Sequence, residues 1–100
     1  MTLEEIEDLL AQHENETGNL ISKSGDSIFA GIEFLDRFQH TVRILKSDAL
    51  NDYFNAKDRE SQKAILDDTR NFITLSTYEI VDFIPSDSSP DRPKFSFLSE

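Results

Sequence analysis

The fold is decided by the stretch from Ser27 to Ala56, which reads SIFAGIEFLDRFQHTVRILKSDALNDYFNA. When its residues are placed about 100° apart, seven large apolar side chains of positions 28–45 fall in one arc of roughly 160°, opposite most of the charged ones, and Phe29 and Ile44 lie outside it. A half-buried strand requires alternation, which Phe34-Leu35 and Ile44-Leu45 break. The pattern therefore predicts an amphipathic helix over Ser27–Ala56 that lies on a core.

The two candidate start signals in this stretch are short polar pairs. Asp26 and Ser27 supply N-cap side chains where the apolar pattern begins. Ser47-Asp48 offers a second cap, so two helices in register are the alternative to one. Because the apolar phase continues through Ala49 and Leu50, we favour one continuous helix.

A second long apolar pattern runs from Glu60 to Ile84. Nine of its side chains share an arc of about 120°, as expected for a helix that packs along one side. The part from Phe72 onward is rich in β-branched and aromatic residues, which favours a strand by propensity alone. Periodicity over several turns outweighs propensity here, so we predict a helix that Pro85 ends.

The N-terminal segment Thr2–His13 has a local signature of a helix. Thr2 and Glu5 form a capping box, and acids fill the first turns, where the helix dipole favours negative charge. The turn residues of positions 14–25 predict a connection. The charged residues 57–60 predict the turn between the two long helices.

These elements together predict an all-α fold. A long antiparallel helical hairpin, Ser27–Ala56 against Glu60–Ile84, carries the short N-terminal helix packed across it. Residues 1–84 form the helical domain of this three- to four-helix arrangement, and two such hairpins can pair as a homodimer. Residues 85–100 form an extended or partly disordered tail, whose apolar end docks either on a partner or on the domain itself.

Composition limits the class of protein. One hundred residues suit a single domain, and the absence of cysteine excludes disulfides and thiolate chemistry. The acidic N-terminus lacks the pattern of a secretory signal, and no run approaches the ~20 apolar residues of a membrane span. We therefore expect a cytoplasmic protein.

The negative charge is concentrated in the first part of the chain. Net charge is −10, and residues 1–36 hold nine acids and one base. Such a field argues against direct binding to nucleic acid or to an anionic membrane, since both need clustered Lys and Arg. It favours a basic protein partner, although solubility alone also explains an acidic surface.

No motif for catalysis, a cofactor or a metal is present. The two histidines are not spaced as zinc ligands on a helix, and there is no EF-hand loop, nucleophile elbow or glycine-rich phosphate loop. We therefore assign no catalytic, cofactor-binding or metal-binding residue and predict that the protein is not an enzyme.

The sequence leaves two functional hypotheses. The first is a small acidic, non-catalytic interaction module that binds a basic partner, as an inhibitor, an immunity-type factor or a DNA mimic does. Its candidate residues are Glu4, Glu5, Glu7, Asp8, Glu33 and Asp36. The second is a structural or adaptor subunit that self-associates or docks through apolar residues outside the main stripes. Its candidate residues are Phe29, Ile44, Tyr78, Val81, Phe95 and Phe97.

Overall fold

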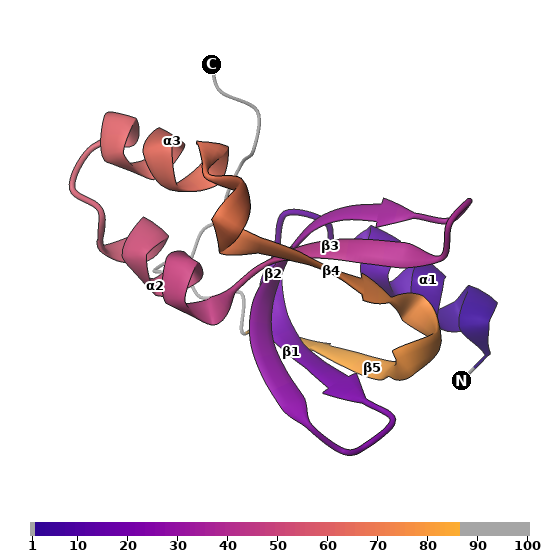
Figure 1. Cartoon of the computed structure of the whole chain (residues 1–100). Coiled ribbons are helices and arrows are strands. Elements are labelled where there is room, and N and C mark those ends of the chain that lie inside the picture. The colour runs from indigo at the N-terminus through magenta and orange to yellow at the C-terminus, as the bar shows by residue number, and fades with distance from the viewer. Residues whose placement is uncertain (1, 87–100) are drawn as a thin grey trace.

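The computed structural model describes residues 2–86, which form a five-stranded antiparallel sheet with three short α-helices (Figure 1). Neighbouring strands pair in the order β4-β3-β2-β1-β5. Two 3-10 turns, η1 and η2, flank β4. The elements in chain order are α1 (Leu3–Gln12), β1 (Thr17–Ser22), β2 (Ser27–Asp36), β3 (Thr41–Leu45), α2 (Ser47–Asn55), α3 (Arg59–Asp67), η1 (Thr69–Asn71), β4 (Phe72–Ser76), η2 (Thr77–Glu79) and β5 (Ile80–Pro85).

The predicted all-α hairpin is wrong, and the helical bundle is wrong with it. The stretch Ser27–Ala56 contains two strands, β2 and β3, and then the short helix α2. The stretch Glu60–Ile84 contains all of α3 except its first residue, and then β4 and β5. The predicted connection over residues 14–25 contains β1.

The helical periodicity misled because the sheet is apolar on both faces. Ile44 is fully buried in one core and its neighbour Leu45 in another, on the opposite face of the sheet. A strand covered on both faces does not alternate between apolar and polar residues. In β2, the pairing with β3 also shifts between Ile32 and Phe34, and this irregularity changes the phase before Leu35. The β propensity of these segments was the better guide.

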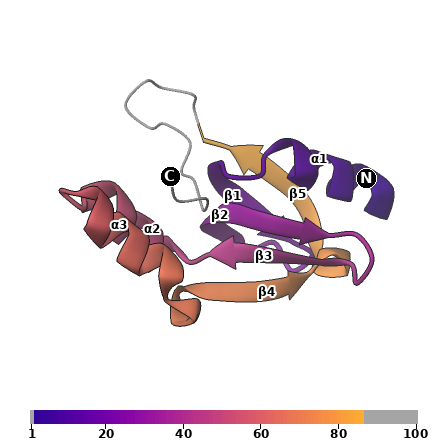
Figure 2. The same cartoon turned by 90° about the horizontal axis from the view of Figure 1, so that it is seen from above.

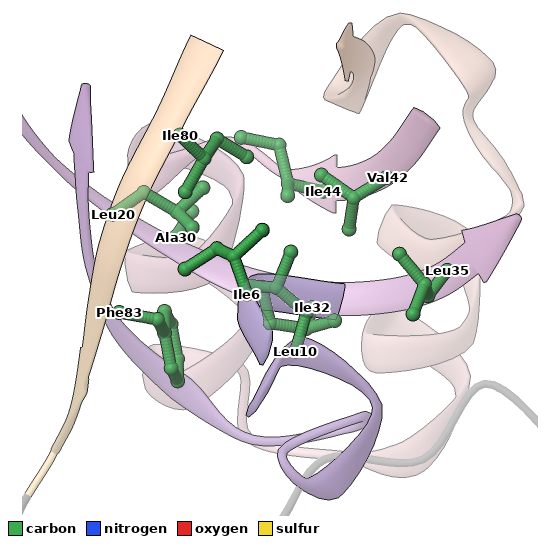
Figure 3. Packing of buried hydrophobic residues seen from close by; sticks show 10 residues of the cluster. All are labelled: Ile6, Leu10, Leu20, Ala30, Ile32, Leu35, Val42, Ile44, Ile80 and Phe83. Carbon is green, nitrogen blue, oxygen red and sulfur yellow. The ribbon is translucent and has the colours of Figure 1, made fainter. Parts of the chain in front are cut away.

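The first core lies between α1 and the sheet. Ile6 and Leu10 of α1 point into it, and both are almost completely buried (Figure 3). Burying an aliphatic side chain of this size contributes about 1.5–3 kcal/mol. The other buried members of the cluster come from the strands: Leu20, Ala30, Ile32, Leu35, Val42, Ile44, Ile80 and Phe83.

The second core joins α2 and α3 to the sheet, at the end of the molecule away from α1 (Figure 2). Its buried members are Leu45, Ala49, Leu50 and Phe72. Half-buried apolar side chains of β2, α2 and α3 surround them, namely Phe29, Tyr53, Phe54, Ile65 and Leu66. The two helices inserted between β3 and β4 thus cover a sheet face that α1 does not reach.

Strand β2 changes partner along its length. Its first half pairs with β1 and its second half with β3, and Gly31 pairs with residues of both, Thr17 and Leu45. The long strand therefore bridges two halves of the sheet, and it curves strongly (Figure 1). In the described chain, β4 and β5 are the two edges of the sheet.

The predictions that depended on a few neighbouring residues agree with the structure more often than the two long helices did. The first helix is confirmed, with the capping box of Thr2 and Glu5 formed at its start. Asp58 caps α3, so residues 57–58 do connect two helices, although both are short. The helix that starts at Ser47 has no side-chain cap. Asp26 lies in the hairpin turn between β1 and β2, where its carbonyl accepts from the Ser22 N–H, and caps no helix.

Across residues 2–86, the helices are all too short or too polar to cross a lipid bilayer.

Gly18 is required by the close pairing of β1 with β5. A Cβ at this position would lie 2.5 Å from the Ile84 carbonyl oxygen and 2.5 Å from Cζ of Phe83. Gly18→Ala is expected to lower the free energy of unfolding by about 1–3 kcal/mol, as overpacking does. Urea unfolding measures this, with Asn19→Ala in the same strand as a control that should stay within about 0.5 kcal/mol of wild type. Equal stability of Gly18→Ala and wild type would contradict the close approach.

Candidate functional site

One buried carboxylate organises the end of the molecule where α1 begins. The Glu7 side chain of α1 is only 5% exposed. Its Oε2 accepts a 2.7 Å hydrogen bond from Oγ1 of Thr77, which is fully buried in η2, and lies 3.0 Å from Nδ1 of His40. We call these three residues the Glu7 brace, because they join α1, the β2–β3 turn and η2.

The Glu7 brace does not have the geometry of a nucleophile–base–acid relay. In such a relay the imidazole stands between the nucleophile and the acid. Here Thr77 and His40 both contact the same oxygen of Glu7, and the Thr77 hydroxyl is closed off from solvent. Hydrogen bonds to a buried charged group contribute about 1.5–3 kcal/mol each, so the arrangement suits a structural role.

The β2–β3 turn, residues 36–40, is held from within and from outside. The Asp36 Oδ1 accepts from the backbone N–H groups of Phe38 and Gln39 at 2.9 and 3.0 Å. His40 adopts a left-handed backbone with φ of 57°, and its carbonyl accepts from the Thr77 N–H at 3.0 Å. These bonds fix the backbone on both sides of the turn.

An ion pair fastens the same turn to α1. Nη2 of Arg37 lies 2.7 Å from Oδ1 of Asp8, and both side chains are about half-exposed. An exposed pair of this kind contributes only about 0.2–1 kcal/mol, so it orients the turn more than it stabilises the domain.

Two aromatic side chains stand at the surface above the brace. Phe38 is 96% exposed at the tip of the turn, and Tyr78 of η2 is 52% exposed. The Tyr78 ring lies 5.3 Å from the His40 ring, measured between centroids. We call the surface formed by these residues and their charged neighbours the turn surface: Asp8, Asp36, Arg37, Phe38, His40 and Tyr78.

Four of the six predicted acids lie on the surface of this end of the molecule. Glu4, Glu5 and Asp8 are exposed on α1, and Asp36 is half-buried in the turn. The backbone and side chain of Thr2 hydrogen-bond the Glu5 carboxylate and hold its pKa below the usual value. The exposed α1 acids therefore adjoin the turn surface.

The other two predicted acids do not belong to this surface. Glu7 is buried and its carboxylate is used inside the domain. Glu33 lies on strand β2, where its Oε1 is 2.9 Å from Nε of Arg43. The Arg43 guanidinium in turn lies 4.6 Å from the centre of the Phe72 ring, which belongs to the second core.

The predicted apolar contact residues are also divided. Ile44 is fully buried in the first core, and Phe29 is half-buried against the second. Tyr78 and Val81 are exposed. Phe95 and Phe97 lie outside the described residues.

Sequence reasoning missed Phe38, which it placed on the buried side of a helix. The available indication was the polar run around it, with Asp36 between two β-branched and aromatic segments. Within residues 2–86, the acids and histidines form no group of three suited to a metal ion.

No family model matches the chain, and neither the curated proteins nor the solved structures include one with significant similarity to it.

The Glu7 brace predicts that two acids of α1, Glu7 and Glu4, contribute very differently to the free energy of unfolding. Glu7→Ala leaves the buried Thr77 hydroxyl without its acceptor, so we expect a loss of about 2–4 kcal/mol in the free energy of unfolding. Glu4→Ala, on the exposed side of α1, should stay within about 0.5 kcal/mol of wild type. Urea unfolding measures both variants. If Glu7→Ala is as stable as Glu4→Ala, the brace does not hold the domain together.

Glu33 and Glu5 are expected to make the free energy of unfolding depend on pH with opposite signs. Burial raises the pKa of Glu33, and Arg43 lowers it in part, so the folded state holds this proton more tightly than the unfolded state. Its stabilising contribution is present below the unfolded pKa and lost as pH rises through the folded pKa. The lowered pKa of Glu5 gives the reverse, a contribution present above the unfolded pKa and lost as pH falls through the folded pKa.

The measurement is the difference in free energy of unfolding between wild type and each Glu→Gln variant, from about pH 3 to pH 7. As pH rises, the stability of the wild type relative to Glu33→Gln is expected to fall. Over the same range, the stability of the wild type relative to Glu5→Gln is expected to rise. Slopes of the same sign in both variants would show that the two environments do not differ as described.

Proposed function

We propose that this protein is a small acidic, non-catalytic interaction module of the cytoplasm, which binds a basic protein through α1 and the turn surface. The observation that supports it is the uneven charge, nine acids against one base in residues 1–36, together with the exposure of Glu4, Glu5 and Asp8 beside the turn. Of these three, Asp8 is paired with Arg37.

The exposed carboxylates of Glu4, Glu5 and Asp8 give the surface beside the turn a negative field, which Arg37 offsets only in part. Such a field attracts a positively charged partner over about one Debye length, ~8 Å at physiological salt, and orients it before contact. Complementary charge mainly raises the association rate and excludes wrong partners. An inhibitor, an immunity-type factor or a DNA mimic would each use carboxylates held on a rigid helix in this way.

A second candidate function is self-association, as a structural or adaptor subunit. It is favoured by exposed apolar residues on both edge strands: Val81 and Ile84 of β5 are 39% and 53% exposed, and Ile73 of β4 is 38% exposed. An open edge with apolar side chains is a template for pairing with another chain. This candidate does not require the acidic end.

The experiment that tests the first function reverses charge at one end of the molecule or at the other. Glu4→Lys/Gln12→Lys changes the exposed side of α1 but leaves the cap, Asp8 and Glu7 untouched. Asn51→Lys/Asp52→Lys, on the exposed side of α2, is the matched control, since both pairs raise the net charge by three. Each protein is immobilised and used to capture proteins from a lysate of the source organism.

We expect wild type and the α2 variant to retain the same basic protein, and the α1 variant to lose it. With that protein purified, affinity should fall steeply as salt rises from about 0.05 to 0.3 M, because exposed charges are screened. Salt-insensitive capture, or equal loss in both variants, would count against the proposal. Sedimentation of the same three proteins tests the second function, for which all should form the same oligomer.

A further inference from the structure

Phe38 is exposed without a structural reason. Its side chain is 96% exposed, whereas the other large exposed apolar residues range from 36% to 56%. The bonds described above hold the turn through the side chains of Asp36, Arg37 and His40 and through the backbone, so another side chain at position 38 would leave them unchanged. The ring therefore adds almost nothing to the stability of the domain, and it exposes a large apolar surface to water.

The ring is also presented on a rigid support. The turn is tied to α1 by Arg37 and Asp8, and to η2 by His40 and Thr77. His40 is joined in addition to the buried Glu7. A side chain presented on a fixed backbone loses little entropy on binding, which is how aromatic anchors contribute to interfaces.

We propose that Phe38 is the anchor of the binding surface, and that its partner is a basic protein segment whose apolar side chains close around the ring. The proposal rests on the proposed function and names the chemistry of the partner. Because Phe38 protrudes, the partner must supply the concave apolar surface. Because Asp36 adjoins the ring and Glu4 and Asp8 lie on α1 beside the turn, Lys or Arg must flank that surface.

The same surroundings decide against two other occupants. A nucleic acid that stacked a base on Phe38 would bring phosphates towards the acids of α1, where Arg37 is the single base in the turn. A second copy of the acidic end would oppose like charges across the contact. Both remain as outcomes of the test.

The test uses a phage-displayed library of random peptides, selected on the immobilised full chain at low salt. The selected peptides are then measured in solution against wild type, Phe38→Ala and the matched control Phe34→Ala, which removes an exposed phenylalanine of β2. We expect basic peptides with large apolar residues. They should bind Phe38→Ala roughly 10- to 100-fold more weakly than wild type and Phe34→Ala with unchanged affinity. The urea midpoint of Phe38→Ala should equal that of wild type, which separates loss of binding from unfolding.

The proposal is overturned if the selected peptides bind Phe38→Ala as tightly as wild type, or if they carry no excess of Lys and Arg. It is also overturned if Phe38→Ala dissociates a wild-type dimer in sedimentation, or abolishes binding to a single-stranded oligonucleotide. Peptides that lose affinity for Glu4→Lys/Gln12→Lys but not for Phe38→Ala refute the anchor and leave the proposed function standing. Peptides insensitive to both variants refute both.

Discussion

The acidic end of this protein depends on one buried oxygen, Oε2 of Glu7. Removing a carboxylate from water is costly, and the cost is offset only when hydrogen bonds replace the lost hydration. Thr77 and His40 supply these contacts from segments far from α1 in the sequence. Glu7 therefore joins the helix, the β2–β3 turn and η2, in addition to the Arg37–Asp8 ion pair and the hydrogen bond from the Thr77 N–H to the His40 carbonyl. The arrangement of the surface residues above them depends on these buried hydrogen bonds. If one of the three segments shifted, a polar group would be left buried and unsatisfied.

A second constraint is that the sheet needs cover on both faces. In β3, Ile44 enters the core under α1 and Leu45 enters the core under α2 and α3, so the strand is buried twice. The insertion of two helices between β3 and β4 meets this need. It also places α2 and α3 at one end of the molecule, away from α1 at the other (Figure 2). The inserted helices and their flanks, residues 46–70, hold five bases and six acids, whereas residues 1–36, which form α1, β1 and β2, hold one base and nine acids.

How much the sequence could predict follows from the range of the interactions. The capping box of Thr2 and Glu5 involves residues three apart and was predicted, and the cap at Asp58 has the same short range. The pairing of Gly18 with Pro85 joins residues that no local pattern connects, so the sheet was not predicted. The site shows the same division. Composition and helical position placed Glu4, Glu5 and Asp8 on an exposed side of α1. The burial of Glu7 depends on His40 and Thr77, which are 33 and 70 positions away in the sequence, so it could not be foreseen.

Two explanations of the acidic surface, binding to a partner and solubility, differ in whether they also explain the exposed ring of Phe38 at the same end. Acids in the first turn of α1 are favoured by the helix dipole, so Glu4 and Glu5 alone fit either purpose. Glu4 and Asp8, however, are four residues apart on one side of the helix, where like charges repel. Arg37 relieves only part of this repulsion, and it does so while tethering the turn that carries Phe38. Solubility would explain the charge, but it is opposed by the exposed phenylalanine. The basic partner that we propose would account for both, because a contact that buried the ring would also neutralise the acids beside it.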